Sequence, residues 1–169
     1  LTSEHQVDAF LTAHHADDQV ETILMRIITG SGIQGIQGIP FFRSPNYYRP
    51  LLSVSRKDIE AFISEYAIAY REDDSNHDRK YRRNKIRQDI LPMIKELNPN
   101  YLEAFTHLSQ VSYEVQEIIS EQFAYFKREF QVNGQINLSE YSQKTYLPTL
   151  IQYILADYAP KKAEIHQMV

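Results

Sequence analysis

The sequence contains no cysteine and no apolar run long enough to cross a membrane. Without cysteine the chain can form neither a disulfide nor a thiolate metal site, which fits a reducing compartment. A membrane-spanning helix needs roughly 20 consecutive apolar residues, and no stretch approaches that length. The N-terminus also lacks an initiator Met and a signal-peptide pattern. We therefore expect a cytoplasmic chain without a membrane partner that is a fragment of a longer protein.

The composition is that of a folded, mildly acidic protein. Its 169 residues suit one ordinary domain with a smaller one appended, and the 43% of hydrophobic residues can build a core. The net charge of -4 argues against a protein that coats nucleic acid. One run, residues 79–87, nevertheless holds six cations and no anion. It indicates a polyanion that docks at one place, and the alternative is a solvated helix face.

The densest group of titratable side chains lies where a predicted strand, residues 7–13, leads into a predicted helix. Either Asp17 or Asp18 can cap this helix, and its apolar residues recur at helical spacing from Val20 to Ile28, which predicts one face toward a sheet. The end of a strand and the start of a helix is where open α/β folds place their chemistry. The group consists of His14, His15, Asp17, Asp18 and Glu21.

Four interpretations of this polar group are open from the residues alone. It is a metal site, although the spacing does not match His-Glu-x-x-His. It is an Asp-rich helix that holds magnesium diphosphate, although a second acidic motif is missing. It is a substrate site of an ATP-using enzyme, in which carboxylates bind a cationic amine and a histidine steadies phosphate charge. The structural alternative is a capped helix whose polar groups are satisfied.

The glycine-punctuated stretch after this helix, residues 33–40, predicts a close-packed loop rather than a helix. It follows a helix instead of a strand and lacks a Gly-Lys-Ser/Thr ending, so it is no Walker loop. The stretch is either purely structural or part of a loop whose backbone binds a ligand. The candidate ligand-binding residues are Gly30, Ser31 and Gly32, which directly precede it. Farther on, Ser55 is expected to cap a helix that ends near Tyr66 and buries Ile59, Phe62 and Ile63.

The composition changes after Leu97. The basic run is expected to open a helix that Pro92 kinks, and residues 101–130 lack both Pro and Gly and predict one long helix. A tight turn at Asn133 and a helix over residues 146–158 should follow. The sequence thus predicts an α/β domain over residues 1–97 and a mainly α-helical domain over residues 98–169.

Three motifs together resemble the tRNA(Ile)-lysidine synthetases, a family of PP-loop ATP pyrophosphatases. They occur in the family's order over about the first 95 residues. The third motif is the one that best distinguishes this family from other ATP pyrophosphatases that modify tRNA. The first is His14-His15-Ala16-Asp17-Asp18-Gln19-Val20-Glu21-Thr22 with Arg26 and Gly30-Ser31-Gly32, the second Arg49-Pro50-Leu51-Leu52 with Ser55-Arg56, and the third Arg71-Glu72-Asp73-Asp74-Ser75-Asn76 with Arg83-Asn84-Lys85-Ile86-Arg87.

The resemblance implies a partial Rossmann-like domain followed by a helical module that contacts tRNA. It implies catalytic roles for His14, Asp18 and Glu21, with Asp18 and Glu21 binding the lysine ammonium. The phosphates of ATP or of tRNA would then meet Arg83, Lys85 and Arg87. We expect no side chains of this chain to form a metal site, because Mg²⁺ comes with ATP.

The reaction that the resemblance implies uses ATP, Mg²⁺, L-lysine and the tRNA(Ile) with a CAU anticodon. ATP adenylates the wobble cytidine at its C2 oxygen, and the lysine amine then displaces AMP to give lysidine. The family's ATP loop, Ser-Gly-Gly-x-Asp-Ser, and its last C-terminal domain are missing here, so the fragment alone should be inactive. The resemblance allows a homodimer. The rival functions are a related tRNA-thiolating pyrophosphatase, whose members commonly use cysteines, and a tRNA-binding module without catalysis.

Overall fold

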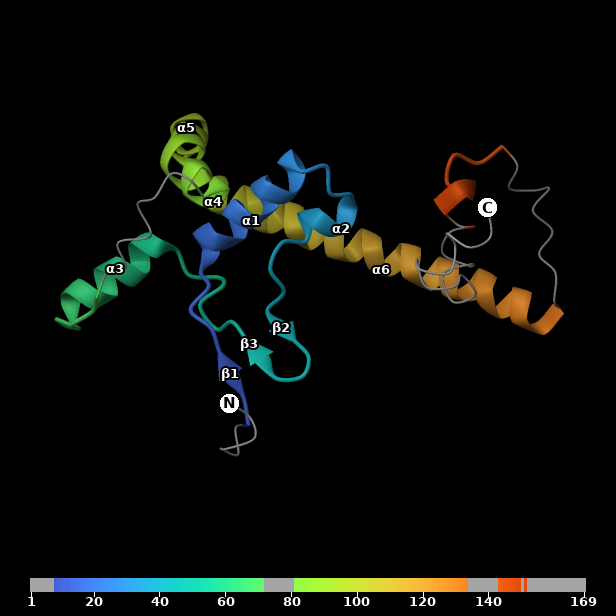
Figure 1. Ribbon diagram of the computed structural model, residues 1–169, viewed down its shortest axis with the longest axis horizontal. Coiled ribbons are helices and arrows are strands. Elements are labelled where there is room, and N and C mark those ends of the chain that lie inside the picture. The colour runs from blue at the N-terminus through green and yellow to red at the C-terminus, as the bar shows by residue number, and fades with distance from the viewer. Residues whose placement is uncertain (1–7, 72–80, 134–142, 150, 152–169) are drawn as a thin grey trace. The chain divides into compact units, whose positions relative to one another are not determined.

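A computed structural model describes residues 8–71, 81–133, 143–149 and 151 of the chain (Figure 1). The chain divides into two compact units, Leu1–Glu114 and Val115–Val169, and each is described by itself. The division falls within one long helix, so the predicted domain boundary after residue 97 stays a prediction. None of the helices described is long and apolar enough to span a bilayer.

A small mixed sheet stands at the N-terminal end of the first unit. Its strands are β1 (Phe10–Leu11), β2 (Phe42–Arg43) and β3 (Tyr47–Tyr48), in the order β1-β3-β2. Strand β1 pairs parallel with β3, and β2 pairs antiparallel with it. Strand β1 covers only residues 10–11 of the strand predicted over residues 7–13, and the burial expected of that strand was wrong for Leu11, which is 71% exposed at an edge that the described chain leaves uncovered. The unit is therefore mostly helical.

Helix α1 (Ala16–Ile28) forms the centre of the first unit (Figure 1). His15, rather than either aspartate, is the N-cap, and its backbone N–H donates to the Asp18 carboxylate at 2.9 Å. The apolar face packs on other helices and not on a sheet, because strands of two residues offer no broad face. Val20 lies in a core cluster with Ile86, Leu91 and Tyr101.

The glycine-rich stretch contains one short helix, α2 (Ile33–Ile36), which corrects the expectation of a loop throughout. Its free groups are held by side chains from other elements. The Gln19 amide donates to the carbonyl of the C-cap residue Gln37 at 3.1 Å, and the Ser112 hydroxyl donates to the Ile33 carbonyl at 2.7 Å. Tertiary hydrogen bonds therefore stabilise a turn that local glycine content disfavours.

Helix α3 (Arg56–Glu65) begins as predicted at Ser55, whose side chain accepts from the Asp58 backbone N–H. The predicted inward position of Phe62 was wrong, since that side chain is 54% exposed. Helix α3 buries no residue fully because it projects away from the α1 core (Figure 1).

The basic run opens a helical segment that α1 contacts, built from α4 (Arg82–Lys85), a π-helical turn η2 (Ile86–Ile90) and α5 (Leu91–Leu97). Pro92 lies in the first turn of α5, where its missing N–H costs little. The long helix predicted from residue 101 is confirmed as α6 (Tyr101–Asn133). The structure shows a turn at residue 146 and helix at residues 147–149 and 151. Asn133 is the last residue of α6, and the rest of the predicted turn and of the predicted last helix lies outside the described residues.

Candidate functional site

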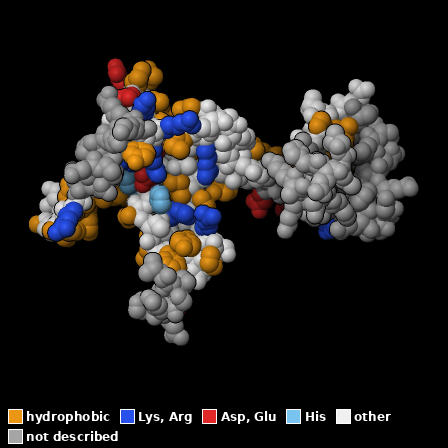
Figure 2. All heavy atoms as spheres, viewed as in Figure 1, with side chains coloured by type: hydrophobic (Ala, Val, Ile, Leu, Met, Phe, Trp, Pro, Cys, Tyr) orange, Lys and Arg blue, Asp and Glu red, His pale blue; other side chains and the backbone are white. Residues whose placement is uncertain are grey.

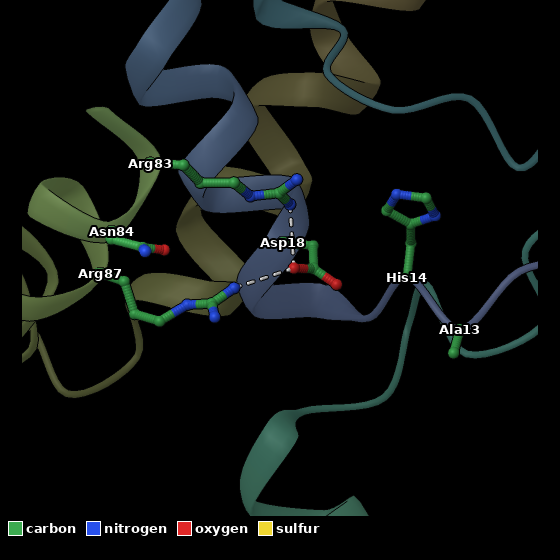
Figure 3. A pocket seen from close by; sticks show the side chains of 6 residues that line it. All are labelled: Ala13, His14, Asp18, Arg83, Asn84 and Arg87. Carbon is green, nitrogen blue, oxygen red and sulfur yellow. Dashed lines mark hydrogen bonds and ion pairs between the residues drawn. The ribbon is translucent and has the colours of Figure 1, made fainter. Parts of the chain in front are cut away.

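The N-terminal half of α1 presents two carboxylates, Asp18 and Glu21, to two guanidinium groups from α4 and η2. Arg83 donates to Glu21 at 2.7 Å and to Asp18 at 2.9 Å. Arg87 donates to Glu21 at 2.6 Å through Nε and at 3.0 Å through a terminal nitrogen. A longer contact of 3.4 Å joins Arg87 to the Asp18 Oδ1 atom. Figure 3 shows both arginines reaching Asp18 from one side.

This cluster is anchored at its inner end and open at its outer end. The Glu21 side chain is 1% exposed, whereas those of Asp18, Arg87 and Arg83 are 12%, 24% and 37% exposed. The hydrogen bond with Glu21 raises the pKa of Arg87 further, against the opposing effect of burial. The buried Glu21 carboxylate accepts from both guanidinium groups and holds both arginines toward Asp18.

Asp17 makes a different set of contacts from its neighbour Asp18. Its Oδ2 atom accepts from the Arg56 backbone N–H at 2.8 Å, and its Oδ1 atom accepts from the Tyr101 hydroxyl at 2.7 Å. Burial, together with this hydrogen bond, raises the pKa of Tyr101. Asp17 thus joins α1 to the beginnings of α3 and α6.

His14 lies across from the arginines, on the segment that links β1 to α1 (Figure 3). Its Nδ1 atom is 2.9 Å from the Thr12 hydroxyl. Burial lowers the pKa of His14, Asp18 opposes that effect, and nearby Arg49 and Arg83 add to it. The imidazole is therefore mainly neutral near pH 7 and can accept or share a proton.

Between these groups lies a hollow of about 320 Å³. It offers a carboxylate, two guanidinium groups and an imidazole to one ligand, and can therefore hold a cation and an anion side by side. Figure 2 shows acidic, basic and histidine side chains gathered where α1 begins. The residues that line the hollow are Ala13, His14, Asp18, Arg83, Asn84 and Arg87.

Three of the predicted site elements do not line this hollow. Glu21 is one of them, although it accepts from both of the arginines that do. Lys85 is exposed and does not line it, because helical spacing turns that residue away from Arg83 and Arg87. Gly30, Ser31 and Gly32 follow the far end of α1, where the Ser31 N–H caps the Arg26 carbonyl at 2.8 Å. The ligand role of this glycine segment stays a prediction. Over the part of the chain that the structure describes, no group of three or more His, Asp or Glu residues could hold a metal ion.

Asn84 is a lining residue that the sequence analysis did not single out as a site. It is 8% exposed and lies between two charged neighbours, so it does not stand out in a basic run of the sequence. Helical spacing could have identified it, since residues 83, 84 and 87 share one face of a helix.

Arg49 was likewise identified only as part of a motif. It is 8% exposed and donates to the Pro40 carbonyl at 2.6 Å.

Comparison with known proteins confirms the resemblance inferred from the three motifs. A family model described as a PP-loop domain matches residues 1–94. A tRNA(Ile)-lysidine synthase of Porphyromonas gingivalis is 33% identical over 169 residues, which are 100% of this chain and 37% of that protein. Proteins of the same name from Francisella philomiragia and Geobacillus kaustophilus are 33% and 39% identical, over 83% and 72% of this chain and 36% and 27% of their own lengths. The matched part of the chain thus covers between 27% and 37% of the length of these relatives.

Proposed function

We propose that this chain, which belongs to the PP-loop domain family, forms the lysine-accepting part of a cytoplasmic tRNA(Ile)-lysidine synthase. The observation that carries the proposal is the hollow at the start of α1, in which Asp18 lies between two arginines and His14. A ligase that joins a cationic amino acid to an anionic nucleic acid needs both signs of charge at one place. The similarity to lysidine synthases over the whole chain supports the same reaction.

In the proposed reaction, ATP transfers AMP to the C2 oxygen of the wobble cytidine in the CAU anticodon and releases pyrophosphate. The lysine ε-amine then forms a bond to C2, the C2–O bond breaks, AMP leaves, and the amine loses a proton. ATP brings Mg²⁺. The chain's own residues hold the amine, orient the base and its phosphates, and take up the proton.

Asp18 is the proposed ligand of the lysine ammonium. Its Oδ1 atom accepts from Arg83 at 2.9 Å and from Arg87 at only 3.4 Å, so the contact with Arg87 is the weaker one that an ammonium would replace. The Arg87 group so released can turn to a phosphate. Glu21 was expected to bind lysine directly; its burial and its three bonds to the arginines support a positioning role as well.

The proposed phosphate ligands are Arg83 and Arg87, with Lys85 farther out on the exposed face of α4. Neutral His14 on the opposite wall is placed to accept the proton that the attacking amine loses. Residues 1–97 would complete a Rossmann-like sheet with the remainder of the PP-loop domain, and residues 98–169 would contact tRNA, whose helices proteins read by shape and backbone.

The test is lysine incorporation by the full-length protein. Purified protein, a tRNA(Ile) transcript, ATP and labelled lysine are combined, and each component is omitted in turn. The proposal expects label in the tRNA only when all are present. Binding of tRNA without incorporation would instead support the non-catalytic module, and incorporation of sulfur from a sulfur donor would support the thiolating relative.

A further inference from the structure

A second hollow, of about 300 Å³, adjoins the Arg87–Glu21 ion pair. Arg87 lines both hollows. The other walls of the second hollow come from α1, from the first residue of α3, from α5 and from the first residue of α6. The lining residues are Asp17, Glu21, Arg56, Arg87, Leu91, Pro92, Lys95 and Tyr101.

The two carboxylates of this hollow are already satisfied within the protein. Asp17 accepts one hydrogen bond on each oxygen, from the Arg56 backbone N–H and from the Tyr101 hydroxyl. Both oxygens of Glu21 accept from arginines. The oxygens of both carboxylates are therefore occupied by donors of the protein, and the donors that remain for a ligand are those of the cationic side chains around them.

Three cations from three different elements face this hollow, namely Arg56, Arg87 and Lys95. Arg56 bonds Glu60 at 2.7 Å through Nε, which uses one of the five N–H donors of a guanidinium. Lys95 is exposed and carries three donors. Leu91 and Pro92 add an apolar wall beside these charges. Arg and Lys donors of this kind contact the phosphate oxygens of nucleic acids.

We propose that this second hollow binds a backbone phosphate of the tRNA next to the nucleotide whose base enters the first hollow. The inference rests on the proposed function and extends it, because it assigns Arg56 and Lys95 to tRNA contact. A phosphate here would also attract the Arg87 guanidinium and draw it from Asp18, where the lysine ammonium binds. Binding of tRNA would thereby prepare the amine site.

The experiment measures the dissociation constant of full-length protein for tRNA(Ile) as a function of salt, without ATP, in Arg56→Gln and Lys95→Gln variants. Each substitution should weaken tRNA binding several-fold at physiological salt. Each should also make the plot of log Kd against log salt concentration shallower, with a slope smaller by about 0.7 to 1. Glu60→Gln should have the opposite effect, because it frees Arg56 from its partner. Lys57→Gln is the matched control, since Lys57 is an exposed neighbour outside the hollow and should leave both quantities unchanged.

A second arm measures the KM for ATP in the same variants. An unchanged ATP KM with weakened tRNA binding supports the proposal, whereas a raised ATP KM with normal tRNA binding assigns the phosphate to ATP and overturns it. Normal values of both also overturn it. Lysine incorporation by the unmodified protein tests the proposed function separately, so failure of the two ideas is distinguishable. Lys95→Gln alters an exposed side chain, which keeps the test valid if Arg56→Gln fails to fold.

Discussion

Asp17 and Asp18 are adjacent in the chain, yet their carboxylates have different tasks. Asp17 joins three helices through the Arg56 backbone and the Tyr101 hydroxyl, and Asp18 faces a hollow beside two arginines. The sequence placed both aspartates in one polar group but could not show that their contacts differ. The partners lie between 39 and 84 residues away, and only the folded chain brings them together.

Glu21 should be the carboxylate whose loss most affects stability. We expect Glu21→Gln to lower the free energy of unfolding by about 1–3 kcal/mol, because two guanidinium groups lose their buried partner. The matched control is Glu60→Gln, whose pair with Arg56 is about half exposed and should matter by less than about 0.5 kcal/mol. Denaturant unfolding of both variants measures the difference. Equal losses would contradict the structural role given to Glu21.

The protonation of His14 gives a second test at the scale of one residue. Burial lowers its pKa, so an NMR titration of the imidazole should have its midpoint below the ordinary value of 6.5. Between that midpoint and 6.5 the unfolded chain binds more protons than the folded one. The contribution of His14 to stability is therefore complete above pH 6.5 and decreases as the pH falls through this window. His14→Gln identifies the resonance, and a midpoint at or above 6.5 would refute the account.

Among the helices and strands, local sequence signals predicted where helices begin better than they predicted which elements pack together. Ser55 and Asp58 form a cap within four residues, and the pattern alone was sufficient to find it. Helix α2 escaped prediction because it depends on Gln19 and Ser112, which are far from it in the chain. The apolar face of α1 was found correctly, but its partners are helices instead of a sheet.

The glycines beside α2 should differ in their tolerance of alanine. At Gly38, φ is +68° and an added Cβ would lie 2.6 Å from the Gln19 side chain, so Gly38→Ala should cost about 2–3 kcal/mol. Gly30 has φ of +77° with open space around it, and Gly30→Ala should cost about 1 kcal/mol. Gly32 has neither constraint. Thermal unfolding should rank the three variants in this order, and a different order would show that the segment does not pack on α1 as described.

At the scale of the whole molecule, the motifs identified the family where composition could not. Net charge and length fit many folded proteins, whereas three ordered motifs specified a PP-loop domain, which the family match confirms over residues 1–94. The sheet was overestimated because apolar runs near Phe10 and Tyr47 indicate strands without giving their length. The ion pairs of Asp18 and Glu21 with the basic run were not foreseen, since charge patterns in sequence do not reveal pairing across more than 60 residues.

The claim that Asp18 receives the lysine ammonium is tested by the steady-state kinetics of Asp18→Asn in the full-length protein. Loss of a charge-assisted contact should raise the lysine KM about 10- to 100-fold and leave the ATP KM within about twofold. Glu65→Gln, an exposed carboxylate on α3, serves as the control and should change neither value. An unchanged lysine KM in Asp18→Asn, with the protein folded and active, would contradict the claim.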